Sequence, residues 1–371
     1  MERLSDALEA CRQIYNTGLT QRRWYYQEKH KSLSYIQQAK EMAEASREDP
    51  ELAQVHSQVR QDVLRRLDKA FSSFFRKAQK GEGQGFPRYK GRSRYHSFTY
   101  PQFGFKLKGE KKLYLSKIGT VRIRKHRDIP SEAIIKICTI KREEDRWYAC
   151  FSLELPDVPQ KQVVFSPVGI DVGILNFAAM SDGTIYKGPK HFHKQEKKLS
   201  REQRSLSRKE KGSMNSRRQA KKVSEVHRRI SNKRKDFLHK LSREIINKHD
   251  LIMVEDLEIK NMIKNRHLAK SIADASWGTF ISMLSYKAEE AGGRVEKVDP
   301  RHTSQVCSGC GESVEKELSV RIHNCPHCRL IMNRDVNAAI NILGSGTGLI
   351  ARGGWRVTAA SEAGNPLFKQ E

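Results

Sequence analysis

The chain has 371 residues, of which 70 are lysine or arginine and 43 are aspartate or glutamate, so its formal net charge is +27. Such an excess of positive charge predicts a polyanionic partner, and nucleic acid before a membrane because no amphipathic lipid anchor is evident. No apolar run approaches the roughly 20 residues of a membrane-spanning helix, and the N-terminus lacks the apolar core of a signal peptide. We therefore expect no membrane partner and a reducing, cytoplasmic location.

The first 80 residues predict a helical lobe. Apolar residues recur there at intervals of three and four, in one stripe from Leu4 to Leu19 and another from Val55 to Phe74. This spacing is typical of amphipathic helices. The glycines of Gly81-Glu-Gly83-Gln-Gly85 then end the helical pattern.

Short runs of β-branched and aromatic residues follow and predict an antiparallel β-barrel over residues 81–162. Between residues 86 and 100, aromatic side chains alternate with cations. Core packing accounts for part of these aromatics. Stacking on bases and pairing with phosphates explains the mixture better, so Arg88, Tyr89 and Lys90 are candidate nucleic-acid contacts.

Residues 163–300 predict a third unit. Residues 168–183 read as two strands closed by an Asp-Gly hairpin turn, and residues 250–255 as a short buried strand that ends in carboxylates. A helix after Trp277 and a strand over residues 294–298 lead into the cysteine-rich segment. The tail, residues 344–371, is rich in glycine and small residues and is expected to be flexible.

The most basic part of the chain lies inside this third unit, in a helical region over residues 187–248. Residues 187–240 hold 20 lysines and arginines against 5 acidic residues. Like charges at this density repel one another unless a phosphate backbone neutralises them; the alternative is a long solvated helix. We expect phosphate contacts from the cations of this region, among them Arg217, Arg218, Lys221, Lys222, Arg228 and Arg229.

Four of the seven cysteines stand in two CxxC pairs, Cys307-Ser-Gly-Cys310 and Cys325-Pro-His-Cys328. Each pair places two thiolates on one tight turn, and the two turns supply the four ligands of tetrahedral zinc. We predict one zinc in a ribbon over residues 301–332. Its role would be structural, because four protein ligands leave no open position for water.

Three carboxylates flank this ribbon. Asp171 lies on a predicted buried strand, Glu255 ends a second one, and Asp335 opens a helix over residues 333–343, where the helix dipole favours an anion. Together they are suited to hold two Mg²⁺ ions and to cut phosphodiester bonds. The alternatives are simple capping roles for Asp171 and Asp335, and Asp256 in place of Glu255, because adjacent strand residues point to opposite faces.

The motifs, in this order, resemble those of the transposon-encoded TnpB proteins (OrfB-type transposases), the RNA-guided relatives of type V CRISPR effectors. The resemblance extends from about Leu4 to Leu343. Its motifs are Cys11-Arg-Gln-Ile-Tyr-Asn16, Phe86-Pro-Arg-Tyr-Lys90 with Ser97-Phe98, Gly169-Ile-Asp171-Val-Gly173, Val254-Glu255-Asp256-Leu257, Thr303-Ser304-Gln305-x-Cys307-Ser-x-Cys310-Gly311, Cys325-x-x-Cys328 and Arg334-Asp335-x-Asn337-Ala-Ala-x-Asn341-Ile342.

The resemblance implies an α+β multidomain protein. Its RuvC-like, RNase-H-type α/β nuclease domain would hold the inserted zinc ribbon and use Asp171, Glu255 and Asp335 as the acidic triad. A helical recognition lobe and a β-barrel wedge domain would precede it. The implied activity is Mg²⁺-dependent, RNA-guided cleavage of DNA, with a guide RNA from the transposon end that pairs with target DNA in a prokaryotic, nucleoid-associated setting. The oligomeric state stays open.

Two other functions compete with this one. A catalytically inactive RNA-guided DNA-binding protein, or repressor, would have no need to keep all three acids. A zinc-ribbon RNA-binding protein would leave Asp171 and Glu255 unexplained. The sequence shows no tyrosine or serine recombinase pattern that would support strand joining by a transposase.

The sequence departs from the family pattern at two places. Family members usually begin with a short strand, whereas this chain starts almost directly in its first helix, so the barrel is expected to lack a strand. Arg329 stands where a glycine commonly follows the last knuckle cysteine. We expect strain in that turn, with all four thiolates still in place.

Overall fold

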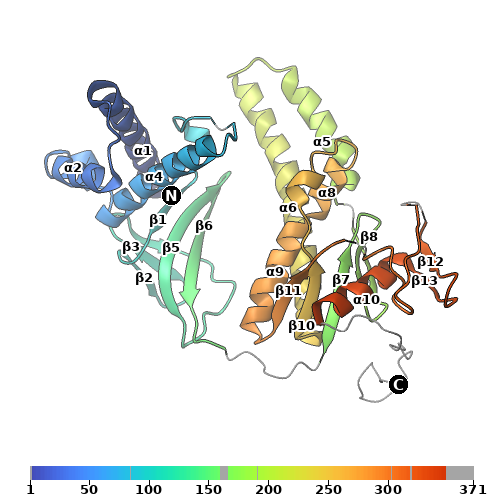
Figure 1. The fold of residues 1–371 in the computed structure, drawn as a ribbon. Coiled ribbons are helices and arrows are strands. Elements are labelled where there is room, and N and C mark those ends of the chain that lie inside the picture. Colours follow the sequence, from blue (N-terminus) through green and yellow to red (C-terminus); the bar gives the residue numbers. More distant parts are fainter. Residues whose placement is uncertain are drawn as a thin grey trace. The chain divides into compact units, whose positions relative to one another are not determined.

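The computed structural model describes residues 2–83, 85–158, 166–189, 191–301, 303–317 and 320–347. The chain divides into two compact units, Met1–Asp157 and Val158–Glu371 (Figure 1). The first unit holds both the predicted helical lobe and the predicted strand region. None of the described helices is both long and apolar enough to cross a membrane.

The first unit consists of helices followed by short strands. The helices are α1 (Glu2–Lys29), α2 (Tyr35–Glu48), α3 (Pro50–Ala53) and α4 (Ser57–Gln79), with a short 3-10 helix η1 (Arg92–Arg94). The strands are β1 (Ser97–Tyr100), β2 (Phe105–Lys108), β3 (Lys112–Leu115), β4 (Gly119–Arg122), β5 (Ile134–Glu143) and β6 (Arg146–Glu154).

The predicted closed barrel is not what these strands form. In the described residues they make two antiparallel sheets, β1-β5-β6 and β2-β3-β4. Each sheet keeps two unpaired edges, whereas a barrel has none. The strands and their antiparallel pairing were predicted, but closure depends on long-range pairing that local patterns do not encode.

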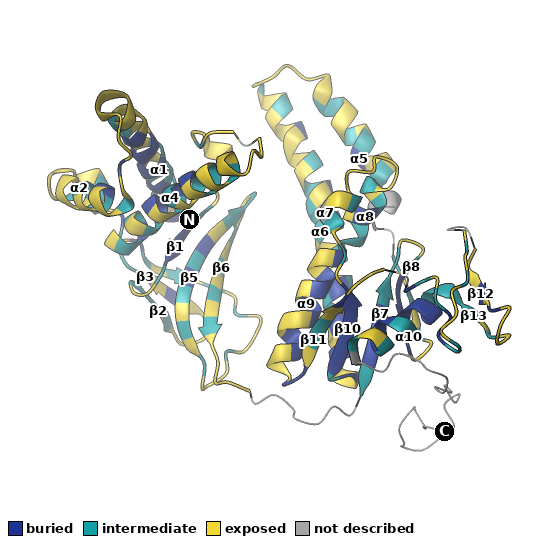
Figure 2. Cartoon of the chain, in the orientation of Figure 1, coloured by how far each residue is buried: buried dark blue, intermediate teal, exposed yellow. Residues whose placement is uncertain are grey.

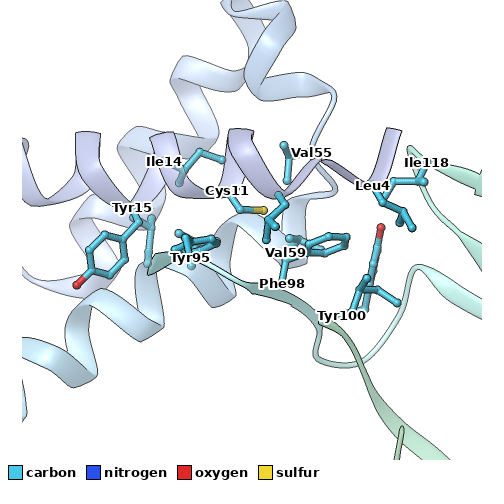
Figure 3. Close-up of a cluster of buried hydrophobic side chains, with 14 of the residues drawn as sticks. Leu4, Cys11, Ile14, Tyr15, Val55, Val59, Tyr95, Phe98, Tyr100 and Ile118 are labelled. Atoms are coloured by element: carbon cyan, nitrogen blue, oxygen red, sulfur yellow. The ribbon is translucent and has the colours of Figure 1, made fainter. Parts of the chain in front are cut away.

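Helices and strands of the first unit share one core. Both predicted apolar stripes are confirmed as buried faces: Leu4 to Leu19 on α1, and Val55 to Phe71 at the start of α4 and along it. Figure 3 shows Cys11 of α1 and Val59 of α4 next to Phe98 of β1. The alternation of buried residues on β3, where Leu113 and Leu115 are buried, continues this core into the second sheet.

The second unit is a mixed sheet with helices on both faces. Its strands are β7 (Pro167–Val172), β8 (Asn176–Met180), β9 (Ile185–Lys187), β10 (Leu251–Glu255) and β11 (Arg294–Val298), with β12 (Ile322–Asn324) and β13 (Ile331–Asn333) as a separate pair. Its helices are α5 (His191–Ser207), α6 (Met214–Lys248), α7 (Ile259–Met262), α8 (Ala269–Ala275), α9 (Trp277–Glu290) and α10 (Arg334–Thr347).

The strand order is β11-β10-β7-β8-β9. Strand β10 runs parallel to β7 and β11, while β8 and β9 run antiparallel to their neighbours. The first strand of the unit therefore lies beside the fourth, with Ile170 opposite Val254. This is the neighbour relation that an RNase-H-type sheet requires, and it brings together two segments that are far apart in the sequence.

Helices cover β10 on both sides, which explains why its sequence is apolar from Leu251 to Val254. Ile252 and Val254 pack in a core with α6 and α9, and Leu251 and Met253 pack against Ile342 and Leu343 of α10. Figure 2 shows β10 buried along its length, between helices whose outer faces are exposed.

The basic region forms a helical hairpin rather than one helix. Helix α5 ends at Ser207, Gly212 adopts a left-handed φ of 87°, and Ser213 caps α6 through a hydrogen bond from the Ser216 amide to its Oγ. The hairpin has a small core of its own, formed by Leu199, Val223, Val226 and Ile230. The later part of α6 packs on the sheet (Figure 1).

Gly169 sets the distance between the sheet and α10. A Cβ at this position would lie 2.0 Å from the Ala339 carbonyl oxygen and 2.8 Å from the Leu343 amide nitrogen. Both atoms belong to the helix backbone, so they cannot rotate away. Any side chain at residue 169 would push α10, and with it Asp335, away from β7.

We expect Gly169→Ala to lower the free energy of unfolding of the second unit by about 2–3 kcal/mol, the upper part of the range for overpacking. In a unit of this size the Tm would fall by about 4–12 °C, measured by calorimetry. Gly188→Ala is the control, because its Cβ would meet Phe177 Cβ at an ordinary 3.5 Å. Equal Tm values for the two variants would show that α10 does not pack this tightly.

Candidate metal and nucleic-acid sites

The three predicted acids lie on neighbouring elements of the second unit. Asp171 is near the end of β7 and Glu255 ends β10. Because Ile170 pairs with Val254, Asp171 and Glu255 are the next residues along two adjacent parallel strands. Asp335 is in the first turn of α10, which packs on β7. The fold thus gathers all three at the carboxyl end of the parallel strands.

The carboxylates of this acid site interact electrostatically. Burial, together with the charges of Glu255 and Asp335, raises the pKa of Asp171 to about 8, against the opposing effect of Arg334. Burial also raises the pKa of Glu255, which a hydrogen bond from Thr303 opposes. The surroundings of these carboxylates therefore disfavour their ionised form, and a bound cation would stabilise that form.

Polar neighbours hold two of the acids in place. Asn176 Nδ2 donates a hydrogen bond to Asp335 Oδ2 at 2.8 Å, and Thr303 Oγ1 donates to Glu255 Oε1 at 2.6 Å. Asn333 Oδ1 accepts the Asp335 amide at 2.9 Å and caps α10. Sequence reasoning missed Asn176 and Asn333 in these roles. Thr303 stood in a quoted motif, but nothing local linked it to Glu255.

The neighbouring residue, Asp256, is placed differently. Its side chain is exposed and pairs with Lys297 at 2.8 Å, on the adjacent strand β11. Glu255, in contrast, is only 9% exposed. The alternation along β10 therefore puts Glu255, and not Asp256, beside the other acids.

All four predicted cysteines come together. One ligand atom from each of Cys307, Cys310, Cys325 and Cys328 lies within 4.8 Å of the others. The Cys307–Cys328 and Cys310–Cys325 Sγ distances are both 3.6 Å. A tetrahedron with metal–sulfur bonds of ~2.3 Å has edges of about 3.8 Å, so the sulfur atoms are spaced for one tetrahedral metal ion.

The two knuckles repeat the same backbone pattern. The Gly311 amide bonds to the Cys307 carbonyl and the Arg329 amide to the Cys325 carbonyl, each at 2.9 Å. Both Gly311 and Arg329 are left-handed, with φ of 80° and 63°. The strain expected at Arg329 is confirmed, because a residue with a Cβ occupies a conformation that favours glycine.

Two asparagines attach the ribbon to α10, the helix that packs on β7. Asn337 is fully buried; its Oδ1 accepts the Ser308 amide at 2.9 Å and its Nδ2 donates to the Val306 carbonyl at 2.8 Å. Asn341 Nδ2 donates to the Thr303 and Val306 carbonyls, both at 2.8 Å. The ribbon base is thus bonded to the helix that carries Asp335.

Within the described residues, the cysteines are the only group of three or more potential metal ligands this closely spaced. The acid site is wider. Buried His323 does not join the cysteine group; its Nδ1 contacts Lys316 Nζ instead.

The aromatic–cationic segment of the first unit lies on α1. Asn16 Oδ1 accepts the Lys90 amide at 2.8 Å, and the Lys90 carbonyl accepts bonds from Arg12 and Asn16. The Tyr89 ring stays 46% exposed under the Arg23 guanidinium. Arg88 is exposed too, so Arg88 and Tyr89 offer a cation and a ring to solvent.

The predicted cations of α6 lie on the hairpin's outer faces. Arg217, Arg218, Lys221, Lys222 and Arg229 are exposed, and Arg228 is partly exposed. Between them, Gln219, Val226 and Ile230 point into the hairpin.

Comparison with known proteins assigns the chain to a family. The family described as "Probable transposase" (OrfB_IS605) matches residues 150–266, and the one described as "Cas12f1-like, TNB domain" matches residues 277–342. A solved structure, "Cryo-EM structure of the Cas12f1-sgRNA-target DNA complex", shares the fold at a TM-score of 0.57, with 16% identity over 91% of this chain and 81% of that one.

Two curated relatives match almost the whole chain at 34% identity. They are "Putative RNA-guided DNA endonuclease InsQ" of Escherichia coli (strain K12), over 98% of this chain and 91% of that protein, and "Putative RNA-guided DNA endonuclease" of Streptomyces pristinaespiralis, over 99% and 92%. The chain therefore belongs to the TnpB family of OrfB-type, transposon-encoded proteins.

Proposed function

We propose that this protein is a transposon-encoded, RNA-guided, Mg²⁺-dependent endonuclease that hydrolyses guide-matched DNA. The observation that carries the proposal is the acid site, where the fold brings Asp171, Glu255 and Asp335 into electrostatic contact across two strands and a helix. The names of the two full-length relatives support the same activity.

The donor set of the acid site fits a hard divalent cation. Its ligands would all be carboxylate oxygens, which Mg²⁺ prefers, and a bound cation would offset the burial and the neighbouring charges that raise the pKa of Asp171. Two such ions, when bound, polarise a phosphodiester and make water acidic enough to attack it.

The chain's own residues would keep this site ready. Asn176 and Thr303 fix the carboxylates of Asp335 and Glu255, so neither has to be reoriented when substrate arrives. Gly169 keeps α10 against β7.

The partners we propose are a guide RNA from the transposon end and target DNA, in the nucleoid of a prokaryotic cell. The cations of the α5–α6 hairpin and the Arg88–Lys90 segment would hold backbone phosphates and stack on bases, while base pairing with the guide would read the sequence. The zinc would be structural and would hold the ribbon base to α10.

Replacing Asp171 by Asn should lower DNA cleavage by at least about 100-fold, because loss of an outer partner alone costs about 10–100-fold. Binding of guide RNA and target DNA should stay unchanged, since the phosphate-binding residues are untouched. The cleavage rate would be measured with guide-loaded protein in Mg²⁺. Binding of guide RNA and target DNA would be measured by filter binding in EDTA.

Asp256→Asn is the matched control and should keep activity, because Asp256 pairs with Lys297 away from the acid site. An Asp171→Asn protein that cuts at the wild-type rate would refute the assignment. A wild type that binds but cuts no matched DNA across a library of flanking motifs would favour the inactive DNA-binding protein.

Purified protein should contain about one zinc per chain, and Cys310→Ser should lose it, because three thiolates bind zinc more weakly than four. Cys150→Ser is the control, since this exposed cysteine lies outside the cluster. Elemental analysis under reducing conditions is the measurement. Folded wild-type protein without zinc would contradict the assignment.

Replacing Arg217, Arg218, Lys221 and Lys222 by Ala should weaken binding to all nucleic-acid sequences alike. The magnitude of the slope of log K against log salt concentration should fall by about 3, because four phosphate contacts release about that many counterions. Asn215→Ala with Ser224→Ala, two exposed neutral residues of α6, should leave the slope unchanged. If the quadruple variant kept the wild-type slope, these cations would face solvent only.

A further inference from the structure

A cavity of about 120 Å³ lies in the second unit beside the turn that follows Asp171. Gly173 and Ile174 of this β7–β8 turn form one side, Phe177 of β8 and Phe237 of α6 another, and Ser271 of α8 a third. None of these residues belongs to the acid triad or to the predicted phosphate contacts. The base cavity, as we name it, is therefore unexplained by cutting chemistry alone.

The walls of the base cavity are aromatic with one polar corner. The Phe177 and Phe237 rings meet edge to face, with centroids 5.1 Å apart. At the corner, Arg234 Nη2 donates to Asp274 Oδ1 at 2.8 Å. Arg234 Nε is buried and has no hydrogen-bond partner among the described residues. A buried donor without a partner is costly, so a ligand with an acceptor atom is favoured here.

The volume of the base cavity matches one small ring. An apolar cavity of about 150 Å³ holds one benzene molecule, so about 120 Å³ suits a single six-membered ring and not a fused pair. A pyrimidine base has that size, a flat face for the phenylalanines and carbonyl oxygens for the Arg234 donor. It must be unpaired to enter, because a base inside a duplex is stacked on both faces.

The base cavity shares its turn with the acid site. Gly173 is two residues after Asp171, and Asn176, the first residue of β8 after the turn, donates a hydrogen bond to Asp335. A base bound here would fix the strand that carries it relative to the acids. We propose that the base cavity binds one unpaired pyrimidine of the DNA strand to be cut and so sets which phosphodiester meets Asp171. The proposal rests on the proposed nuclease function.

Photocrosslinking tests the binding without any cleavage. Guide-loaded protein in EDTA would be irradiated with a single-stranded oligonucleotide that contains 4-thiothymidine, and crosslinked peptides would be mapped by mass spectrometry. We expect crosslinks in peptides with Phe177 or Phe237. Ser271→Phe, which fills the cavity, should reduce their yield at least fivefold.

The matched control is Ala273→Phe, which puts the same ring on α8 at an exposed position outside the cavity. It should crosslink like wild type. Arg234→Lys keeps the positive charge opposite Asp274 but removes Nε, and should also reduce the yield, so the test survives if Ser271→Phe fails to fold. Equal yields from all four proteins, or crosslinks only elsewhere, would overturn the proposal.

A cleavage assay separates this proposal from the nuclease assignment. Single abasic sites would be scanned through the cut region of matched DNA. In wild type, an abasic site at one position should slow cutting by about 5- to 150-fold, the loss of one base–aromatic contact, and a purine there should slow it too. Ser271→Phe should lose this position dependence. Efficient wild-type cutting with a flat abasic profile would refute the base cavity alone, whereas crosslinks without cutting would refute only the nuclease.

Discussion

Repulsion among three carboxylates is the constraint that the second unit must accommodate. Burial and the neighbouring charges raise the pKa of Asp171 to about 8, so the site resists full ionisation until a cation arrives. The fold holds the acids together by placing them on β7, β10 and α10, elements whose packing is fixed by the apolar cores on both faces of the sheet. Gly169 then allows α10 to approach more closely than any other residue would permit.

The position of the zinc ribbon in the sequence follows from the same constraint. The ribbon is inserted between Glu255 and Asp335, and its base bonds to Glu255 and to the helix that carries Asp335. Thr303, at its start, bonds to Glu255, while Asn337 and Asn341 of α10 bond to the backbone at Thr303 and Val306. A metal ion bound tetrahedrally by the four cysteines would make the ribbon base rigid. A structural metal ion would in this way support the geometry of the separate acid site. Arg329 adopts a left-handed backbone conformation. The knuckle therefore keeps its shape even with a residue whose Cβ disfavours that conformation.

Residue spacing was enough to predict the elements that local patterns determine. The helical stripes of α1 and α4, the apolar run of β10 and the two CxxC turns all appear where periodicity and spacing put them. Long-range pairing was the limit. Local sequence does not distinguish a closed barrel from the two sheets β1-β5-β6 and β2-β3-β4. The residues near Asn176 likewise do not predict its hydrogen bond to Asp335, 159 residues away. The flexible tail expected over residues 344–371 is wrong at its start, because α10 continues to Thr347. From residue 348 onward the tail lies outside the described residues, and the finer domain boundaries stay predictions.

The basic hairpin follows a different physical rule from the acid site. Its core consists of Leu199, Val226 and Ile230 with Val223, which is a small apolar area to set against the repulsion of so many cations. A structure of this kind gains stability when a polyanion binds the folded form, because ligand binding adds RT ln(1 + [L]/Kd) to the free energy of unfolding. In the proposed nuclease, a nucleic acid with its divalent counterions would supply cations to the acid site and anions to the hairpin. The two charge excesses of the chain would then be complementary requirements for one substrate.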